Sequence, residues 1–336
     1  MRRLGASLLA MAGAWAVPGG AAQARADFIF EKAPFPSCHA STIVETAPGE
    51  LLAAWFGGSD EGESDVAIWG ARKVAGRWSE PFELVREPDI ATFNPVLFFS
   101  ADGVLWLSYK FGPDPRSWTG AMLESRDRGK TWLAPRHLPA GLYGPIKNKP
   151  LVLRDGAIVS GTSVESYQAW TCWVERSRDH GRSWSKHGPI VVPNEPYGII
   201  QPAIVPLPGG RLRMFVRSTQ RIGRICVADS NDEGVTWSEA RPTAIPNPNS
   251  GLDAVALKDG RIILVYNHTE KGRSPLNVAV SRDGDQWNQF LDLETGPGEF
   301  SYPAVIQAAN GDVHVTYTWK RTRIKHVEIR LDEIPR

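Results

Sequence analysis

One short motif recurs along this sequence at a nearly constant distance. The pattern S-x-D-x-G-x-[ST]-W is complete three times, and the copies end at Trp132, Trp184 and Trp237. A related segment ends at Trp78 and a copy one residue shorter ends at Trp287, so successive tryptophans lie 50 to 54 residues apart. A period of this size indicates a fold built from repeated structural units.

The segments between these motifs are typical of short β-strands. Five of them follow a glycine turn and are rich in β-branched and aromatic residues: GELLAAWF, GVLWLSYKF, GRLRMFVRS, GRIILVYNH and GDVHVTYTW. No segment after the N-terminal region has the periodicity of an amphipathic helix. Four strands in each unit of about 50 residues, arranged around an axis, are typical of a β-propeller. We therefore predict an all-β fold, a single six-bladed β-propeller over residues 27–336.

The residue types that recur in every copy of the motif suit a tight turn. An aspartate accepts hydrogen bonds from turn amides, and a glycine adopts a positive φ without strain. A tryptophan offers a large apolar surface that can pack between neighbouring sheets. We therefore predict a structural role for the motif and place none of its residues in an active site.

The composition excludes some partners and leaves the cysteines without a chemical role. A formal net charge of +1 over 336 residues argues against nucleic acid, which usually selects a clear excess of Lys and Arg. Cys38, Cys172 and Cys226 lack the spacing of metal ligands and are expected to be buried, with a Cys172–Cys226 disulfide left open. We predict neither a metal nor a cofactor.

The N-terminus is typical of a secretory signal peptide. Arg2 and Arg3 precede the apolar run LGASLLAMAGAWAV, and the small residues that follow suit cleavage near Ala24 or Ala26. The apolar run is shorter than the roughly 20 residues that span a bilayer. We assign residues 1–26 to the signal peptide and predict a periplasmic or secreted protein with no membrane span after cleavage.

A polar residue precedes the first expected strand of every blade. These six residues are His39, Asn94, Lys149, Gln201, Asp253 and Tyr302. In a propeller the innermost strands begin around the mouth of the central channel, so we expect these side chains to line a ligand pocket. The alternative is a ring of hydrated channel residues that binds no ligand.

The repeated motif resembles the Asp-box of sialidases, and the sequence is identified as a member of the sialidase-like (BNR-repeat) six-bladed propellers. An Asp-box indicates the fold but not the activity. The resemblance implies an exported exo-glycosidase that removes a terminal sugar, expected to be acidic, from a glycan substrate. Sialidases use a tyrosine nucleophile, an activating glutamate, an acid/base aspartate and three arginines that bind the substrate carboxylate.

The resemblance assigns roles to several residues. Tyr302, in EFSYPAVIQAANG, stands where the family has its nucleophile. Arg217 follows Gln201 by 16 residues, as the second arginine of the family follows the activating glutamate, and Arg273 resembles the third. Two guanidinium groups facing one channel suit bidentate binding of a carboxylate.

The expected acid/base residue lies in the loop GGSDEGESD. The resemblance favours Asp60, with Glu61, Glu63 and Asp65 as rivals. A solvated turn without catalytic function is the alternative interpretation of so many acidic side chains in one loop.

Two positions depart from the family pattern. His39 replaces the first arginine, and Gln201 replaces the activating glutamate although an amide cannot accept a proton. His39 or Asp253 could act on Tyr302 instead, because an imidazole or a carboxylate serves as acid or base. Gln201 is then expected to bind substrate.

The remaining polar residues of the expected pocket suit a sugar. Lys149, Asn94 and Asn249 can bind hydroxyl or anionic groups, although loops rich in Asn and Pro are also good turn formers. The altered arginine set leaves other functions open. These are a hydrolase or lyase of uronic-acid glycans on the same propeller, or a non-catalytic glycan-binding propeller.

Overall fold

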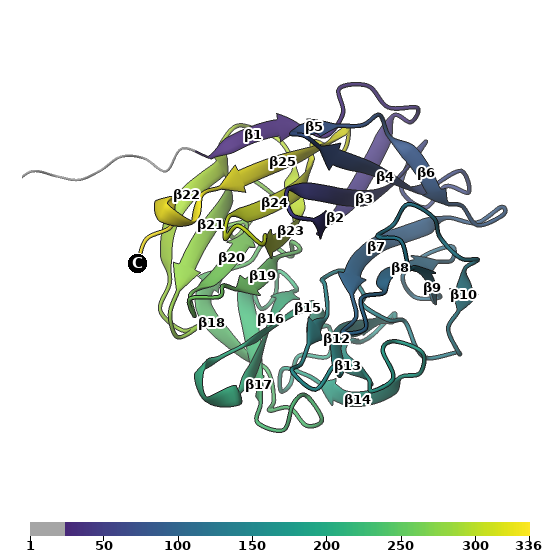
Figure 1. Cartoon of the computed structure of the whole chain (residues 1–336). Coiled ribbons are helices and arrows are strands. Elements are labelled where there is room, and N and C mark those ends of the chain that lie inside the picture. The colour runs from purple at the N-terminus through teal and green to yellow at the C-terminus, as the bar shows by residue number, and fades with distance from the viewer. Residues whose placement is uncertain (1–23) are drawn as a thin grey trace, which may run out of the picture.

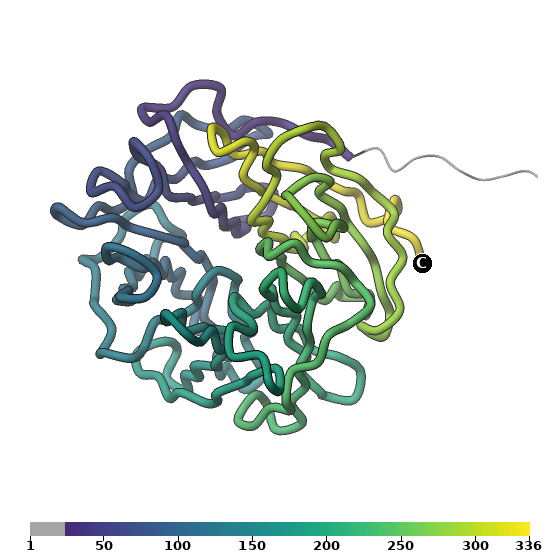
Figure 2. The backbone as a smooth tube through the Cα atoms, turned by 180° about the vertical axis from the view of Figure 1, so that it is seen from behind, coloured from purple at the N-terminus to yellow at the C-terminus, as the bar shows by residue number. Residues whose placement is uncertain are grey.

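The computed structural model describes residues 24–336, which form six antiparallel sheets around a central axis (Figure 1). Figure 2 shows the same ring from behind. The sheets are the blades of a β-propeller, and the predicted all-β, six-bladed fold is confirmed. Residues 1–23, which carry most of the predicted signal peptide, lie outside the described residues.

The first three blades follow one another along the chain, each starting near the axis. Blade one contains β2 (Ser37–Ala47), β3 (Glu50–Gly58), β4 (Ala67–Val74), β5 (Arg77–Trp78) and β6 (Phe82–Val85), with β5 and β6 both paired to β4. Blade two contains β7 (Thr92–Phe99), β8 (Leu105–Phe111), β9 (Thr119–Ser125) and β10 (Arg136–His137). Blade three contains β11 (Leu151–Val152), β12 (Ile158–Glu165), β13 (Trp170–Ser177) and β14 (Ser185–Ile190).

The other three blades complete the ring. Blade four contains β15 (Ile199–Pro206), β16 (Leu212–Ser218), β17 (Arg224–Ser230) and β18 (Arg241–Pro246). Blade five contains β19 (Asp253–Ala256), β20 (Ile262–Tyr266), β21 (Leu276–Ser281) and β22 (Asn288–Glu294). Blade six contains β23 (Phe300–Gln307), β24 (Val313–Trp319), β25 (Arg323–Ile329) and β1 (Arg25–Phe28). Two short 3-10 helices span Pro208–Gly210 and Leu331–Glu333.

The N-terminal strand closes the ring. β1 pairs antiparallel with β25, with Arg25 opposite Glu328 and Phe28 opposite Lys325 (Figure 1). The first two residues of this strand, Arg25 and Ala26, fall within the predicted signal peptide of residues 1–26. Cleavage after Ala24 would leave the strand whole, whereas cleavage after Ala26 would remove half of it.

The apolar core lies in layers between neighbouring blades. Between blades one and two, for example, Leu52 and Leu105 are fully buried in one cluster, against which Trp132 packs. Trp237 packs in the same way between blades three and four, and Trp287 between blades four and five. Burying a large apolar side chain contributes about 1.5–3 kcal/mol, so these layers hold the blades together. The predicted packing of the motif tryptophans is confirmed.

The Asp-box residues form the predicted turns. In the copy at 230–237, Asp232 accepts hydrogen bonds from the Ser230 hydroxyl at 2.8 Å and from the Thr236 amide at 2.8 Å. Gly234, at φ 84°, donates its amide to the Ser230 hydroxyl, and the Trp237 indole donates to the Gly234 carbonyl. The Thr236 hydrogen bonds lower the pKa of Asp232 to about 2. Each carboxylate is therefore occupied within its own turn.

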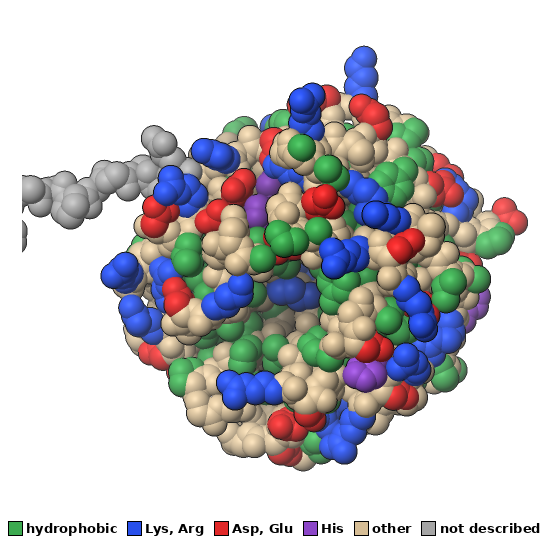
Figure 3. Space-filling view, viewed as in Figure 1, with side chains coloured by type: hydrophobic (Ala, Val, Ile, Leu, Met, Phe, Trp, Pro, Cys, Tyr) green, Lys and Arg blue, Asp and Glu red, His purple; other side chains and the backbone are tan. Residues whose placement is uncertain are grey.

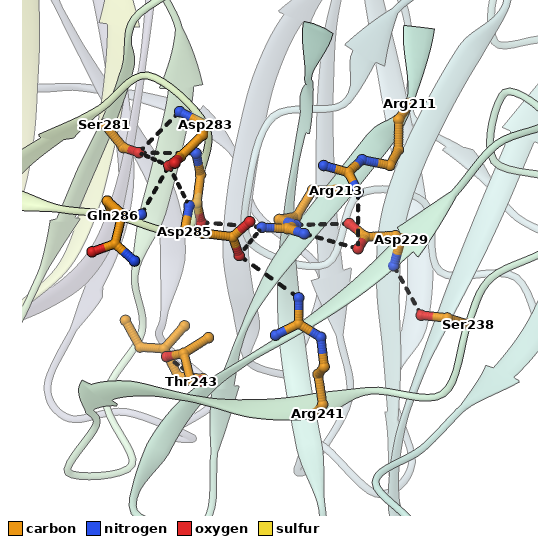
Figure 4. Close-up of polar contacts among 12 residues, drawn as sticks. Arg211, Arg213, Asp229, Ser238, Arg241, Thr243, Ser281, Asp283, Asp285 and Gln286 are labelled. Atoms are coloured by element: carbon orange, nitrogen blue, oxygen red, sulfur yellow. Dashed lines mark hydrogen bonds and ion pairs between the residues drawn. The ribbon is translucent and has the colours of Figure 1, made fainter. Parts of the chain in front are cut away.

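The short copy of the motif also links two blades (Figure 4). Asp283 accepts the Ser281 hydroxyl at 3.1 Å, as in the complete copies. Next to this turn, the buried Arg213 of blade four donates to Asp229 at 2.7 Å and to Asp285 of blade five at 2.6 Å. This face of the ring, which carries the Asp-box turns, is called the opposite face below.

The other end of the ring, called the mouth, is where β2, β7, β11, β15, β19 and β23 begin. In four of these strands the pairing register shifts close to the start, and one residue has a positive φ: Ala40, Asn94, Gln201 and Tyr302. A β-bulge redirects the side chain at which it occurs and is frequent next to active sites. Non-glycine residues with positive φ are strained, so the surrounding structure must hold them.

Cys38, Cys172 and Cys226 are buried and free, as expected for cysteines without a chemical role. Within residues 24–336 there is no helix of the length and apolar character that a membrane crossing needs.

Candidate active site at the mouth

Tyr302 lies where side chains from several blades meet. Its phenolic oxygen accepts a hydrogen bond from Arg217 Nη1 at 2.8 Å and one from Gln201 Nε2 at 3.1 Å. The His39 ring packs against the Tyr302 ring with 4.1 Å between centroids. The residue is 9% exposed. Because both hydrogen bonds are donated to the oxygen, they stabilise negative charge on it.

Arg217 connects the residues of this cluster. It lies near the end of β16, and its Nη1 also donates to Gln201 Oε1 at 3.2 Å, while its Nε donates to Asn249 Oδ1 at 2.7 Å. The structure thus brings together four predicted site residues from blades four and six and the segment before blade five.

Positive charges surround the Tyr302 ring. Lys147 Nζ lies 5.8 Å from the ring centroid, and the guanidinium carbons of Arg217 and Arg273 lie at 5.7 Å and 5.6 Å. Lys147 is buried and donates to the carbonyls of Leu252 and Pro303, so it also joins blades five and six. Burial lowers the pKa of Lys147 to about 7.

His39 lies in the cluster but not at the expected position. Ala40, not His39, has the positive φ that matches Tyr302 in blade six, so the predicted equivalence of the six leading residues is wrong by one residue in blade one. His39 Nδ1 lies 2.9 Å from Thr318 Oγ1, and the buried Nε2 has no partner within residues 24–336. Burial, followed by the charge of Arg321, holds the pKa of His39 well below its usual range. The imidazole is therefore neutral.

A third arginine, Arg321, belongs to the site and was missed from the sequence. Its carbonyl accepts the Cys38 amide, which places it beside His39, where the family pattern has an arginine. Its guanidinium pairs with Glu299 at 2.9 Å and with Glu61 at 2.5 Å, and Arg273 pairs with the same Glu299 oxygen at 2.7 Å. Burial opposes ionisation of Glu299, but the two arginines lower its pKa. Arg321 lies two residues beyond the end of β24, whereas Arg217 lies inside β16, and the residue of blade six that corresponds to Arg217 is Thr318.

Asp253 and Lys149 form an ion pair with each other. Lys149 Nζ lies 2.9 Å from Asp253 Oδ2, which also accepts the Val305 amide, and Oδ1 accepts the Ala254 amide. Asp253 therefore connects blades five and six and makes no hydrogen bond to Tyr302. The predicted catalytic use of Asp253 gains no support from this arrangement.

Asn94 occupies the same bulge in blade two as Tyr302 does in blade six, and it is buried. The structure gives it no hydrogen bond to the Tyr302 cluster within the described part of the chain.

The acidic loop lies at the rim of the mouth. Asp60 is exposed, and its carboxylate accepts only the Glu61 amide among the residues described. Asp65 accepts the Ser59 amide and hydroxyl, which fixes the turn. Glu61 pairs with Arg321 and thus connects this loop to the arginine set. Asp60, the favoured acid/base residue, forms no hydrogen bond or ion pair with these arginines.

Glu165 is a second residue that sequence reasoning missed. It is the last residue of β12 and lies two residues after Ser163. The Ser163 hydroxyl accepts a hydrogen bond from the backbone amide of Gln201 at 3.3 Å. The Glu165 carboxyl forms no hydrogen bond or ion pair with any described residue, unlike Glu61, Glu299 and Asp253. Burial raises the pKa of Glu165. The positive charge of Arg217 opposes this shift, and the negative charge of Glu61 adds to it. Glu165 is therefore a carboxyl near the site whose protonated form is favoured more than that of an exposed glutamate.

The space-filling view, in the orientation of Figure 1, shows acidic and basic side chains interspersed over this side of the ring and a hollow at its centre (Figure 3). Within residues 24–336, no group of three or more His, Cys, Asp or Glu side chains is placed to hold a metal ion.

The fold and the turns define the class of protein: a six-bladed β-propeller stabilised by Asp-boxes. The chain belongs to the family with a BNR repeat-like domain, whose model matches residues 49–315. A search of curated proteins found no significant match.

Several solved structures share the fold. A protein of unknown function from Dyadobacter fermentans matches with a TM-score of 0.77 and 18% identity over 94% of this chain and 100% of that one. The NanB sialidase of Streptococcus pneumoniae matches with a TM-score of 0.76 and 14% identity over 92% and 71%. The intramolecular trans-sialidase of Ruminococcus gnavus matches with a TM-score of 0.71 and 14% identity over 88% and 95%. At these identities the likeness shows the sialidase-like fold and no specific activity.

Proposed function

We propose that this protein is an exported glycoside-cleaving enzyme that removes a terminal acidic sugar from glycans, with Tyr302 as the reacting group. The observation that carries the proposal is the Tyr302 oxygen, which accepts hydrogen bonds from Arg217 and Gln201 beside further cations. A phenol is a weak nucleophile unless its surroundings favour loss of the proton.

The arginines supply a binding site for the sugar's carboxylate. Arg217, Arg273 and Arg321 come from blades four, five and six, and all three affect His39 electrostatically. Glu299 and Glu61 pair with two of them, so the excess positive charge is small and suits a substrate with one carboxylate. Guanidinium groups bind carboxylates through two parallel hydrogen bonds.

Two neighbours of Tyr302 provide the proton transfers. His39, whose ring packs against Tyr302 and whose Nε2 has no partner among the described residues, takes the phenolic proton as the oxygen attacks the anomeric carbon. It does so once the bound substrate carboxylate offsets the arginine charges that, after burial, lower the pKa of the imidazole. Glu165 gives its proton to the departing glycosidic oxygen, because it is the nearby carboxyl without a partner among the described residues. Both roles differ from the family pattern, in which a glutamate and a loop aspartate would act.

The experiment is an assay of the purified protein on methylumbelliferyl sialoside and on uronic-acid oligosaccharides. Release of the intact acidic sugar supports a hydrolase, whereas an unsaturated uronic acid, detected by its ultraviolet absorbance, identifies a lyase. Failure to cleave any member of the panel, with an intact circular-dichroism spectrum, contradicts the proposal.

A glycan-binding propeller without catalysis is a second candidate. Gln201 favours it, because an amide stands where the family has a proton acceptor and instead donates to Tyr302. In that case acidic glycans bind without turnover, and Tyr302→Phe changes their affinity little in calorimetry.

A further inference from the structure

Two exposed aromatic side chains stand at the mouth. Within residues 24–336, five large apolar side chains are strongly exposed: Val74, Leu133, Tyr167, Tyr197 and Val235. The first, second and last lie on the opposite face, in or beside its turns. The two tyrosines, at 74% and 42% exposed, both lie at the mouth between blades three and four. Clustered exposed aromatic groups often mark a binding surface.

The two tyrosines belong to one continuous surface. Tyr167 lies in the turn between β12 and β13, and Tyr197 lies between β14 and β15. Trp170 forms a parallel bridge with Tyr197, and its amide donates to the Pro196 carbonyl at 2.8 Å. The segments that carry the tyrosines are thus joined by backbone hydrogen bonds.

The surroundings of the tyrosines are held in place and are nearly neutral. The Arg116 guanidinium lies 4.3 Å from the Tyr167 ring centroid and is itself paired with Asp114 at 2.7 Å. Beside Tyr197, Arg221 pairs with Glu195 at 3.0 Å. Because the two arginines next to the tyrosines are each paired with a carboxylate, the surface suits a neutral ligand better than an ion.

The segments that carry this surface are also linked to the Tyr302 site. Glu165 is two residues before Tyr167 on the same hairpin, and Ser163 binds the Gln201 amide, while the Gln201 side chain donates to Tyr302. A group that left the anomeric carbon on this side would pass Glu165 first and the tyrosines next.

We propose that Tyr167 and Tyr197 form a subsite for the neutral sugar to which the terminal acidic sugar is attached. This inference rests on the proposed function and extends it to the leaving group. The apolar C–H face of a pyranose packs on an aromatic ring while its hydroxyls stay hydrated, and tyrosine adds a hydroxyl that can hydrogen-bond to the sugar. The subsite makes the enzyme prefer an acidic sugar on a glycan chain over the same sugar on a small alcohol.

The test compares two substrates that differ only in the leaving group. The acidic sugar that the protein cleaves is supplied as its methyl glycoside and as its lactose glycoside. For the double variant Tyr167→Ala/Tyr197→Ala, we expect kcat/KM on the lactose glycoside to fall about tenfold, mostly through KM, and on the methyl glycoside to stay within about twofold. Leu133→Ala/Val235→Ala, which removes exposed side chains from the opposite face, should change neither.

A second measurement does not depend on turnover. Saturation-transfer NMR on Tyr302→Phe with the lactose glycoside should show contact to the lactose protons, and this contact should be lost in the added double variant. An equal loss on both substrates, or no loss on either, overturns the subsite while the cleavage activity stands. If the unaltered protein cleaves no acidic glycoside, the proposed function fails and the subsite falls with it.

Discussion

The two faces of the ring solve different problems with the same six blades. On the opposite face one turn is built repeatedly with the same side chains, and its carboxylates are occupied within the turn. At the mouth the corresponding bulges carry different residues, Ala40, Asn94, Gln201 and Tyr302. The mouth also holds polar groups without partners among the described residues, such as His39 Nε2. Repetition with carboxylates paired inside each turn therefore indicates stability, and variation of the side chain at corresponding bulges indicates ligand binding.

Removal of the Tyr302 hydroxyl is expected to have the largest effect on activity and almost none on stability. Tyr302→Phe should lower kcat by at least about a thousandfold, because the reacting oxygen is gone. The melting temperature should change little, since the ring still fills its place. Tyr317→Phe, in the same blade, loses a hydrogen bond to Glu294 at 2.8 Å and should lower stability but not kcat. A Tyr302→Phe enzyme with a tenth of normal activity would show that another group reacts.

Two arginines on one strand allow a direct comparison of the faces. Arg217→Met removes the donor to Tyr302 and should lower kcat/KM about 10² to 10³-fold with little loss of stability. Arg213→Met, near the other end of β16, should leave kcat/KM intact. It should lower the free energy of unfolding by about 2 kcal/mol, because the Asp229 and Asp285 carboxylates lose their partner but stay partly hydrated. Urea unfolding and steady-state kinetics on both variants give the answer, and reversed outcomes would contradict the division of the faces.

Glu165→Gln should show an effect that depends on the leaving group. With a poor leaving group such as an alkyl alcohol, kcat should fall about 100-fold, whereas with nitrophenol, which needs little protonation, it should fall less than about fivefold. Because burial raises the pKa of Glu165, the wild-type rate should decline as pH rises through that pKa. The variant should lack this decline. Asp60→Asn is the control, and its kcat should stay within about twofold of the wild-type value. A larger loss of kcat in this variant would indicate that Asp60 is the general acid.

The smallest effect is expected at a single Asp-box. Asp232→Asn should lower the melting temperature by a few degrees without changing kcat/KM. The folded-state pKa of Asp232, at about 2, lies below its ordinary value of 3.8, so its contribution to stability is present above pH 3.8 and is lost as pH falls toward 2. The variant should therefore lose less stability than the wild type between pH 4 and pH 2. Unchanged acid sensitivity would contradict the role given to this carboxylate.

The fold could be predicted from the sequence because its information is local and repeated. An aspartate, a glycine and a tryptophan at fixed spacing determine one turn, and the period of the turns determines the number of blades. The sequence also allowed four residues to be assigned to one ligand pocket, because each stands at the start of a blade or at a fixed distance from such a start. These residues are Tyr302, Arg217, Gln201 and Asn249.

The rest of the site depends on features that no spacing shows. The bulge at Ala40 shifts blade one by a single residue, so His39 could not be aligned correctly with Tyr302. Glu165 and Arg321 stand at the ends of second strands, where charged residues are common in any hairpin. Only the packing of neighbouring blades shows that Glu165 has no partner among the described residues. The same packing shows that Arg321 and Arg273 both pair with Glu299.

The pairing of β1 with β25 also bears on how the protein is made. Arg25 lies opposite Glu328, so the sheet that completes the ring joins positions about 300 residues apart. Contacts between such distant positions form late, because the intervening chain must first lose conformational freedom. Synthesis of nearly the whole polypeptide must therefore precede closure, and until then blade six exposes an unpaired strand edge. That interval is the period in which aggregation is the greatest risk.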